Sequence, residues 1–359
     1  MSLTHSLTFH KLRIADVRRE TADCVSIAFT VPDALCDPYR FTPGQYLTLR
    51  TVRDGEELRR AYSICSAPDD SELRIAIKRV PGGRFSAWAT TDLIIGDTLD
   101  VMTPMGRFSA DILGDGKTYV ALAAGSGITP ILSIMRSVLA REPRSHFVLL
   151  LGNRRIADII FREQIQDLKD CYLAQFSVFH VLSGEQQDLP VLSGRLDARL
   201  LQTVLPTLVP ILAIDHVLIC GPQEMSDALL PALRELGIAA DRIQTERFTA
   251  APGASVTRAP PIAESAPRAI VTAILGGTAV KFPVHGDDAL IDAAQRAGLD
   301  LPFSCKGGMC CTCRAKILEG TVEMTVNYSL EPWEIKAGFV LTCQSRPTRA
   351  RVTVDYDQV

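Results

Sequence analysis

Four cysteines in the C-terminal part of the chain have a spacing that suits a metal cluster. Cys305, Cys310 and Cys313 are separated by four and then by two residues, and Cys343 follows after a gap that can hold a strand, a loop and a short helix. Three thiolates on one loop with a remote fourth is the plant-type spacing for a [2Fe–2S] cluster. The sequence therefore predicts that these four side chains bind such a cluster.

Two alternatives to this interpretation are a zinc site and a set of unrelated cysteines. Zinc sites favour two repeated pairs of closely spaced ligands, whereas here three cysteines share one loop. Gly307 and Gly308 permit the positive φ and close backbone approach that wrapping a cluster demands. N–H groups directed at the sulfides would stabilise the negative charge of the cluster. Cys311 breaks the spacing, so we interpret it as a non-ligand that fills a small buried position.

Length and composition are those of a globular protein with more than one domain. With 359 residues, 47% hydrophobic and 22% charged, the chain exceeds the size of a single hydrophobic core. The net charge of -3 and the lack of a long basic block argue against nucleic acid as a partner. We expect a cytoplasmic protein without a membrane span, because the N-terminus has no secretory signal pattern and the longest apolar runs are strand-length. A reducing compartment favours metal binding over disulfides for a tight cysteine cluster.

The pattern of elements divides the chain into four regions. Residues 1–112 hold short β-like segments separated by turns and one helical candidate, which predicts a small antiparallel barrel. Residues 113–249 alternate apolar strands with amphipathic helices, which predicts a doubly wound parallel sheet. Residues 250–269 hold four prolines among alanine and serine and are predicted to be a linker. Residues 270–359 begin with a predicted hairpin and helix and contain the cysteine loop.

The predicted elements are defined by their periodicity and by the turn residues that bound them. The predicted strands are residues 9–17, 24–30, 45–49, 73–78, 98–102, 119–123, 146–151, 176–181, 216–219, 270–275 and 280–284. The predicted helices are residues 85–90, 130–140, 159–168, 224–236 and 288–297.

Two short motifs in the barrel region have residue types that suit a flavin. The first is Arg60-Ala61-Tyr62-Ser63, which taken alone could also be a surface arginine beside a packed tyrosine. The second is a glycine pair that opens the helical candidate, where free N–H groups and the positive end of the helix dipole could hold a pyrophosphate. Two phosphate-binding elements fit FAD better than FMN. The predicted diphosphate-binding residues are Gly83, Arg84, Phe85 and Ser86.

A glycine-containing turn follows the first strand of the α/β region. Gly125 and Gly127 would let the backbone approach a dinucleotide, Thr129 can cap the next helix, and Pro130 suits its first turn. The turn departs from the G-x-G-x-x-G pattern of ordinary dinucleotide-binding folds, and the alternative is a tight strand-to-helix turn without a ligand.

Two arginines end the second strand of this region, where the ribose of an adenine nucleotide should lie. Arg154 and Arg155 stand there without an acidic residue that could bind a free 2′-hydroxyl. Arginine at this position favours a 2′-phosphate, and therefore NADPH over NADH. Solvated surface arginines are the alternative.

These motifs together resemble the ferredoxin–NADP reductase family. In that family the arginine of the first motif neutralises a flavin phosphate, the tyrosine stacks on the isoalloxazine and the serine hydrogen-bonds near the flavin N5. The resemblance assigns these roles to Arg60, Tyr62 and Ser63. The turn at Gly125 is similar to the nicotinamide-binding turn of the same family.

The end of the α/β region carries two further matches to the family. Cys220-Gly221-Pro222 resembles a motif that places Cys220 near the nicotinamide, although a buried core cysteine is the alternative. Glu246 and Phe248 match an acid and an aromatic residue that lie beside the flavin. The resemblance thus implies that Ser63, Cys220 and Glu246 form the catalytic centre.

The order of the domains narrows the family further. A flavin barrel, a nicotinamide domain and a C-terminal plant-type ferredoxin domain with the β-grasp fold resemble the reductase components of multicomponent oxygenases, and among these most closely the reductase subunits of phenylacetyl-CoA epoxidases. The resemblance implies that a hydride passes from NADPH or NADH to FAD, and that electrons leave singly through the [2Fe–2S] cluster to a di-iron oxygenase complex.

Other acceptors and other classes of protein remain open from the sequence. Reductases of Rieske dioxygenases and alkane hydroxylases share the same domain plan. A stand-alone flavin or quinone reductase is a further alternative, as is a ferredoxin-like scaffold module without enzymatic activity, against which three separate cofactor motifs argue.

Overall fold

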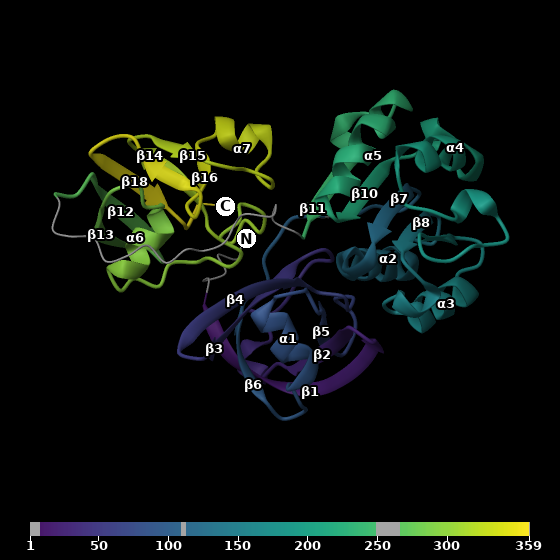
Figure 1. Cartoon of the computed structure of the whole chain (residues 1–359), viewed down its shortest axis with the longest axis horizontal. Helices are drawn as coiled ribbons and strands as arrows, with labels where there is room; N and C mark the ends of the chain where they lie inside the picture. The colour runs from purple at the N-terminus through teal and green to yellow at the C-terminus, as the bar shows by residue number, and fades with distance from the viewer. Residues whose placement is uncertain (1–7, 109–112, 249–265, 359) are drawn as a thin grey trace. The chain divides into compact units, whose positions relative to one another are not determined.

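The computed structural model describes residues 8–108, 113–248 and 266–358 of the chain (Figure 1). They form two compact units, one made mainly by residues 9–248 and one mainly by residues 266–358. Most of the predicted linker at 250–269 lies outside the described residues. The larger unit contains a β-barrel and an α/β domain, and the smaller one contains the cysteine loop.

The first part of the larger unit is an antiparallel barrel, as predicted. Its sheet has the strand order β4-β3-β6-β1-β2-β5, and a further bridge between Ile64 and Ile75 joins the end of β4 to β5, so that the two edges meet. Alternate residues of β1 and β2 point into a core that also receives Phe85 from α1. The elements are β1 (Phe9–Thr21), β2 (Cys24–Thr30), β3 (Tyr46–Arg53), β4 (Glu56–Ser63), β5 (Leu73–Lys78), α1 (Arg84–Thr91) and β6 (Thr98–Met102).

The second part of the larger unit is a doubly wound parallel sheet, as predicted. Its strand order is β11-β10-β7-β8-β9, and each neighbouring pair is parallel. One core lies under α2 and α3, and a second core lies under α4 and α5 on the opposite face of the sheet (Figure 1). The elements are β7 (Thr118–Ala124), α2 (Ile128–Arg141), β8 (His146–Asn153), α3 (Arg162–Cys171), β9 (Phe176–Leu182), α4 (Ala198–Leu208), β10 (His216–Gly221), α5 (Gln223–Glu235) and β11 (Ile243–Arg247).

The strand order places a switch point at the centre of this sheet. From β7 the chain runs outward through β8 and β9, and then returns to the other side of β7 with β10 and β11. In such sheets, ligands bind in the crevice outside the carboxyl ends of the strands where the order reverses. The turns after β7 and β10, which carry two of the predicted motifs, meet at this crevice.

The smaller unit has a mixed sheet, as predicted for a β-grasp fold. The strand order is β13-β12-β18-β14-β16, and the central strands β12 and β18 are parallel. Helix α6 covers one face of this sheet with Leu290 and Ile291, and the glycine pair Gly276-Gly277 closes the predicted hairpin with positive φ at both residues. The elements are β12 (Ala269–Leu275), β13 (Thr278–Val284), α6 (Leu290–Arg296), β14 (Arg314–Glu319), β15 (Val322–Met324), α7 (Pro332–Lys336), β16 (Phe339–Leu341), β17 (Ser345–Pro347) and β18 (Arg351–Asp355).

Short 3-10 turns connect several of these elements. They are η1 (Asp33–Leu35), η2 (Gly125–Gly127), η3 (Ile156–Asp158), η4 (Pro190–Leu192), η5 (Ile211–Ala213) and η6 (Ala240–Arg242).

One predicted helix begins later than expected, and several elements of the structure were not predicted, among them β4, α4 and β11. The helix predicted at 159–168 begins only at Arg162, because Phe161 has a left-handed φ of 60° that breaks the run. Strand β4 was not predicted as a strand, because its residues, Glu-Glu-Leu-Arg-Arg-Ala-Tyr-Ser, have no clear apolar alternation. Tertiary pairing overrides such weak local preference.

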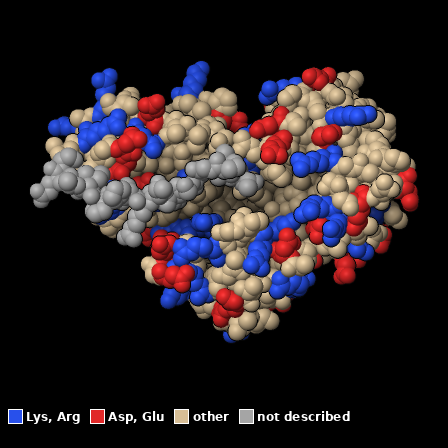
Figure 2. Space-filling model, in the orientation of Figure 1, with Lys and Arg blue, Asp and Glu red and all other residues tan. Residues whose placement is uncertain are grey.

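The lengths of the helices and the distribution of surface charge agree with the composition of a globular protein. Within the described part of the chain, no helix is both long and apolar enough to cross a bilayer. On the face seen in Figure 2, acidic and basic side chains are interspersed.

Candidate functional site

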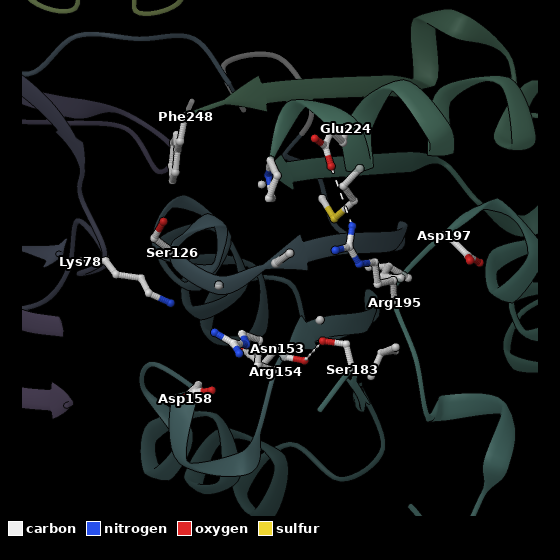
Figure 3. Close-up of a pocket in the computed structure, with 18 of the residues that line it drawn as sticks. Lys78, Ser126, Asn153, Arg154, Asp158, Ser183, Arg195, Asp197, Glu224 and Phe248 are labelled. Atoms are coloured by element: carbon white, nitrogen blue, oxygen red, sulfur yellow. Dashed lines mark hydrogen bonds and ion pairs between the residues drawn. The ribbon is translucent and has the colours of Figure 1, made fainter. Parts of the chain in front are cut away.

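A cavity of about 780 Å³ opens at the switch point of the parallel sheet. Its walls come from the turn after β7, the ends of β8 and β10, the start of α5 and the end of strand β5 of the barrel (Figure 3). Its volume is within the range of small-molecule and cofactor sites. All its lining residues belong to the larger unit.

The glycine turn and the Cys-Gly-Pro turn are in direct backbone contact at this cavity. A Cβ added to Gly127 would lie 2.0 Å from the carbonyl oxygen of Cys220 and 2.9 Å from the nitrogen of Gly221. Gly125 has a φ of 54°, which favours glycine. The glycines at 125 and 127 are therefore required by a left-handed turn and by a close approach of two strand ends.

Of the other two residues of the glycine motif, Pro130 has its predicted position and Thr129 does not. Pro130 lies in the first turn of α2, as predicted. Thr129 does not cap the helix, because the N-cap residue is Gly127 and the Thr129 hydroxyl donates to the carbonyl of Ser126 at 2.9 Å. The chain enters α2 through a 3-10 turn, and the helix begins at Ile128, two residues before its predicted start.

Three predicted catalytic residues meet between the barrel and the parallel sheet. Cys220 and Glu246 are register partners on β10 and β11, and Ser63 ends β4. The Ser63 hydroxyl donates to Glu246 Oε2 at 3.4 Å, and Cys220 Sγ lies 4.0 Å from the same oxygen. Burial raises the pKa of Glu246 to about 8, against the opposing effect of the Ser63 hydrogen bond. Burial and the nearby Glu246 also raise the pKa of Cys220, so the thiol is neutral.

Charged side chains of both signs line the rest of the cavity. In Figure 3, Lys78 reaches into it from one side and Arg195 from the other, and Arg154 lies near its floor. Arg195 pairs with Glu224 at 3.8 Å, and both side chains are exposed. Arg155 is exposed and is not among the residues that line the cavity. Asp23, Asp158, Asp197 and Glu224 also line the cavity, so its basic side chains are matched by an equal number of acidic ones.

Phe248 and Pro222 supply apolar surface to the cavity. Phe248 is 38% exposed although it is a large aromatic side chain, and it lines the cavity together with Pro222. Figure 3 shows its ring at the mouth, on the same side as Ser126. Gly221 allows the close passage of this turn, because a Cβ there would lie 2.7 Å from the methyl carbon of Met225.

The two flavin motifs lie on adjacent parts of the barrel. Tyr62 is half-buried on β4, and its ring centroid is 5.7 Å from that of Phe85 on α1. Phe85 is fully buried in the barrel core, so only its backbone can face a ligand. Arg60 is exposed on β4 and donates to the carbonyl of Arg59 at 2.7 Å.

The start of α1 presents backbone donors. Gly83 is the N-cap residue, and the first helical hydrogen bond is donated by Ala87, so the N–H groups of Arg84, Phe85 and Ser86 are those that a helix leaves unpaired. The Ser86 hydroxyl is not directed outward, because it accepts from the N–H of Val80 at 3.1 Å and donates to the Gly83 carbonyl.

Arg84 is paired with acidic residues rather than lying over the helix start. Its guanidinium donates to Glu56, the first residue of β4, and to Asp54 on the turn before it, the latter at 3.2 Å. Hydrogen bonds to these two carboxylates raise the pKa of Arg84. A phosphate at this helix would compete with Glu56 and Asp54 for the side chain.

The cysteine thiols of the smaller unit lie in two pairs. Cys305 and Cys310 form one pair, with the N–H of Cys305 3.4 Å from Cys310 Sγ, and Cys313 and Cys343 form the other, in which each thiol shifts the pKa of its partner. Hydrogen bonds from Cys310 and from nearby backbone N–H groups lower the pKa of Cys305. Among the described residues, no three metal-ligating side chains converge on one point.

Two pairs of thiols suit two bridged irons better than a single zinc ion. In a cluster with four cysteine ligands, each iron has two thiolates, whereas structural zinc needs four ligands around one point. The residues present therefore fit a [2Fe–2S] cluster, which supplies one-electron transfer when bound.

Donors around the thiols favour a negative group. The N–H of Gly307 lies 3.3 Å from Cys305 Sγ, and the buried Thr312 hydroxyl donates to Cys310 Sγ at 3.2 Å. Cys311 has a φ of 52° and donates to the Ser329 hydroxyl at 3.0 Å. It is half-buried, not buried as predicted, because the left-handed turn directs it toward the loop at 327–330.

Comparisons with known proteins agree with this geometry. Family models match an oxidoreductase FAD-binding domain at residues 11–110, an oxidoreductase NAD-binding domain at 121–230 and a 2Fe-2S iron-sulfur cluster binding domain at 274–348. One of the subunits of the 1,2-phenylacetyl-CoA epoxidase of Escherichia coli (strain K12) is 43% identical over 352 residues, which cover 98% of each chain. The chain belongs to the reductase components of multicomponent oxygenases.

Two further relatives support membership of this reductase family. The ferredoxin reductase component of the 3-ketosteroid-9-alpha-monooxygenase of Rhodococcus rhodochrous is 32% identical over 96% of each chain. The solved structure of phthalate dioxygenase reductase is 25% identical, covers 97% of this chain and 98% of its own, and superposes with a TM-score of 0.59.

Membership of the oxygenase reductases confirms the predicted family, fold and cofactor classes. The chain is an oxidoreductase with an FAD-binding barrel, an NAD-binding α/β domain and a 2Fe–2S ferredoxin domain, and its relatives pass electrons to oxygenase components. The zinc and scaffold alternatives are therefore wrong.

Some cavity residues of this reductase were missed by the sequence analysis. Lys78, Ser126 and Arg195 line the cavity, but Lys78 lies at the end of a barrel strand and Arg195 lies beyond η4, far from the motifs in sequence. Neither Lys78 nor Arg195 belongs to a recognisable motif, and only the docking of the barrel on the sheet brings Lys78 to the cavity.

Proposed function

We propose that this reductase oxidises NADPH and delivers single electrons to a di-iron phenylacetyl-CoA epoxidase of phenylacetate degradation. The alignment with a subunit of such an epoxidase, 43% identical along nearly the whole of both chains, is the observation that carries the choice of acceptor. Bound FAD supplies the step from a two-electron donor to one-electron transfer, because a flavin can hold one or two electrons and the cluster only one.

The arginine at the end of β8 supports NADPH as the donor. Lys78, Arg154 and Arg195 line the cavity, and arginines bind phosphate by two parallel hydrogen bonds. We assign the 2′-phosphate to Arg154, which ends β8, where a nucleotide ribose binds in related folds. Arg155 lies outside the lining and has at most a long-range electrostatic effect on the nucleotide.

The backbone at the cavity supports a nicotinamide position beside Cys220. Gly125 and Gly127 bring the start of α2 close to the ends of β7 and β10, and first-turn N–H groups there can face the nucleotide phosphates. Gly221 and Pro222 continue the wall on which the nicotinamide would lie. We infer that Thr129 and Pro130 shape this turn and do not bind the nucleotide by their side chains.

The buried acid supports a proton-holding role beside the flavin. Because burial raises the pKa of Glu246 to about 8, its carboxyl holds a proton at neutral pH. Ser63 lies within 3.4 Å of that carboxyl and can exchange a proton with it. We propose that Ser63, Cys220 and Glu246 position the reacting rings, exclude water and store one proton near the hydride-transfer site.

The flavin is proposed to lie along β4 and the start of α1. Tyr62 would stack on its ring system and Arg60 would neutralise a phosphate, while the N–H groups of residues 84–86 and the N-cap Gly83 would hold the diphosphate. Phe248 would cover the outer side of the ring, because it is aromatic, partly exposed and close to Glu246 in sequence. Arg84 must release Glu56 and Asp54 to reach the diphosphate.

The cluster ligands are proposed to be Cys305, Cys310, Cys313 and Cys343. Their arrangement in two pairs of thiols and the N–H donors around them support this assignment. We also propose a cytoplasmic location, which is supported by the need of this cysteine cluster for reducing conditions.

A reconstitution experiment tests the proposed acceptor. Purified reductase loaded with FAD and iron–sulfur cluster is mixed with NADPH, phenylacetyl-CoA and the oxygenase subunits of a phenylacetyl-CoA epoxidase, and the epoxide is measured by mass spectrometry. For comparison, the same reductase is mixed with the oxygenase of a 3-ketosteroid-9-alpha-monooxygenase and the substrate of that oxygenase. Faster product formation with the steroid oxygenase would refute the proposed partner.

A further inference from the structure

Gln344 connects the two separate parts of the cysteine ligand set. It follows Cys343 directly, and its Nε2 lies 3.5 Å from Cys343 Sγ and 2.8 Å from the carbonyl oxygen of Lys306. A side-chain amide has two N–H donors, so both contacts can be hydrogen bonds at once. One amide therefore joins the remote cysteine to the residue that follows Cys305.

The contact at Lys306 holds a backbone conformation that a lysine rarely adopts. Lys306 has a φ of 50°, in the left-handed region that disfavours side chains other than glycine. Its ammonium is fixed on α6 by Asp292 at 2.7 Å and by Gln295 at 2.5 Å. The Gln344 amide holds the backbone carbonyl of Lys306 by a hydrogen bond. It therefore also fixes the direction in which the chain leaves Cys305.

The amide of Gln344 is positioned by the fold around it. The backbone N–H of Gln344 donates to the carbonyl oxygen of Leu341 at 2.8 Å, and its backbone carbonyl accepts from the N–H of Thr325 at 3.0 Å. The side-chain stem packs on Gly308, where a Cβ would lie 3.3 Å from Gln344 Cγ. The half-buried side chain thus has its place set by β15, β17 and the ligand loop.

We propose that Gln344 is a positioning residue of the cluster, which holds the turn beside Cys305 and, by donating a hydrogen bond to the Cys343 sulfur, raises the reduction potential. Reduction adds one electron to the group that the thiolates hold, and no bond to the protein forms or breaks. A donor directed at a ligand sulfur stabilises the added negative charge more in the reduced state than in the oxidised one. The inference rests on the proposed set of four cysteine ligands.

The test is a redox titration of the complete holoprotein, followed by electron paramagnetic resonance of the reduced cluster. Gln344→Met keeps a similar side-chain length and removes both N–H donors. At the potential where the wild-type cluster is half reduced, the ratio of reduced to oxidised cluster should fall about threefold, or ~28 mV at about 59 mV per tenfold for one electron. An unchanged potential in Gln344→Met overturns the proposal.

A matched control is Gln358→Met in the same unit. The Gln358 amide contacts Asp355 at 2.9 Å and lies on the C-terminal segment, outside the ligand loop. Its variant should titrate like the wild type. If both variants shifted the reduction potential equally, the shift would not depend on the contacts of Gln344, and its proposed role would be overturned.

A second pair of variants covers the case in which Gln344→Met does not retain its cluster. Lys306→Gly removes the cost of the left-handed conformation, so the double variant Lys306→Gly/Gln344→Met should retain the cluster and still show the same threefold change relative to Lys306→Gly. Equal potentials in these two proteins overturn the proposal. Absence of iron and sulfide from the wild type would instead overturn the ligand assignment itself.

Discussion

The contact between Gly127 and the Cys220 peptide makes Gly127→Ala a sharp test of the nicotinamide site. The added Cβ would lie 2.0 Å from the Cys220 carbonyl oxygen and 2.5 Å from its carbonyl carbon. Both are backbone atoms of β10, an interior strand of the parallel sheet, so no side-chain rotation can relieve the clash. The start of α2 and the end of β10 must move apart by about an ångström or more to restore ordinary contact distances.

The size of the effect follows from this displacement. Overpacking of a well-packed core costs about 1–3 kcal/mol, which corresponds to a fall of roughly 2–12 °C in the melting temperature for a unit of this size. A misplacement of about 1 Å at a reacting centre can slow a reaction about 100-fold. Stopped-flow reduction of the bound flavin by NADPH should therefore be slowed about 100-fold, while the cluster content stays at the wild-type level.

Gly114→Ala is the control for this substitution. A Cβ at Gly114 would have only the Lys117 side chain near it, at 3.8 Å, so the variant should melt and react like the wild type. If Gly127→Ala reduced its flavin at the wild-type rate, the close approach of the two turns would not determine hydride transfer, and the reasoning would be refuted.

Three other perturbations test the remaining parts of the site. Cys310→Ser should abolish electron transfer to cytochrome c but leave flavin reduction by NADPH intact; cytochrome c reduction at the wild-type rate would contradict the series of cofactors. Arg154→Ala should raise the KM for NADPH at least about tenfold more than that for NADH, with Arg155→Ala as the control, and equal effects on both nucleotides would refute the 2′-phosphate assignment. Because burial raises the pKa of Glu246 from 4.5 to about 8, its contribution to stability is complete below about pH 4.5 and is lost as the pH rises toward 8, a loss of about 3–5 kcal/mol. Urea unfolding at pH 5 and pH 8.5 should show this loss in the wild type and a flatter profile in Glu246→Gln, and identical profiles would count against a buried acid.

The fold was predictable where one element carries its own periodic signal. The strands of the parallel sheet are nearly continuous apolar runs, and the central strand β7 is buried from Tyr119 to Ala123, which is typical of a sheet covered on both faces. Strand β4 was missed because Arg59 and Arg60 interrupt its apolar pattern, although it forms the edge of the barrel sheet. Its pairing with β3 stabilises it, and pairing is a non-local interaction.

The candidate site was likewise predictable where a local pattern marks its residues, and not where distant residues meet. The cysteine spacing and the glycine turn were recognisable because they are local, and their chemistry needs particular residues at particular intervals. Thr129 was predicted to cap α2, but the 3-10 turn before α2 makes Gly127 the N-cap residue, and no side chain caps the helix. The carboxylates that engage Arg84 come from a hairpin roughly 30 residues upstream, where no local pattern indicates a partner.

By itself, the sequence determined which residue types are available and where the chain must turn: four thiols at cluster spacing, and glycines where a side chain could not be accommodated. The tertiary structure decided the electrostatic state of those groups. The pKa of Glu246 is raised only because β4 and β10 bury its carboxyl beside Ser63 and Cys220, and Gln344 meets Lys306 only because the loop folds back on β17. Burial and long-range contacts depend on how distant segments pack, and packing is a property of the whole fold.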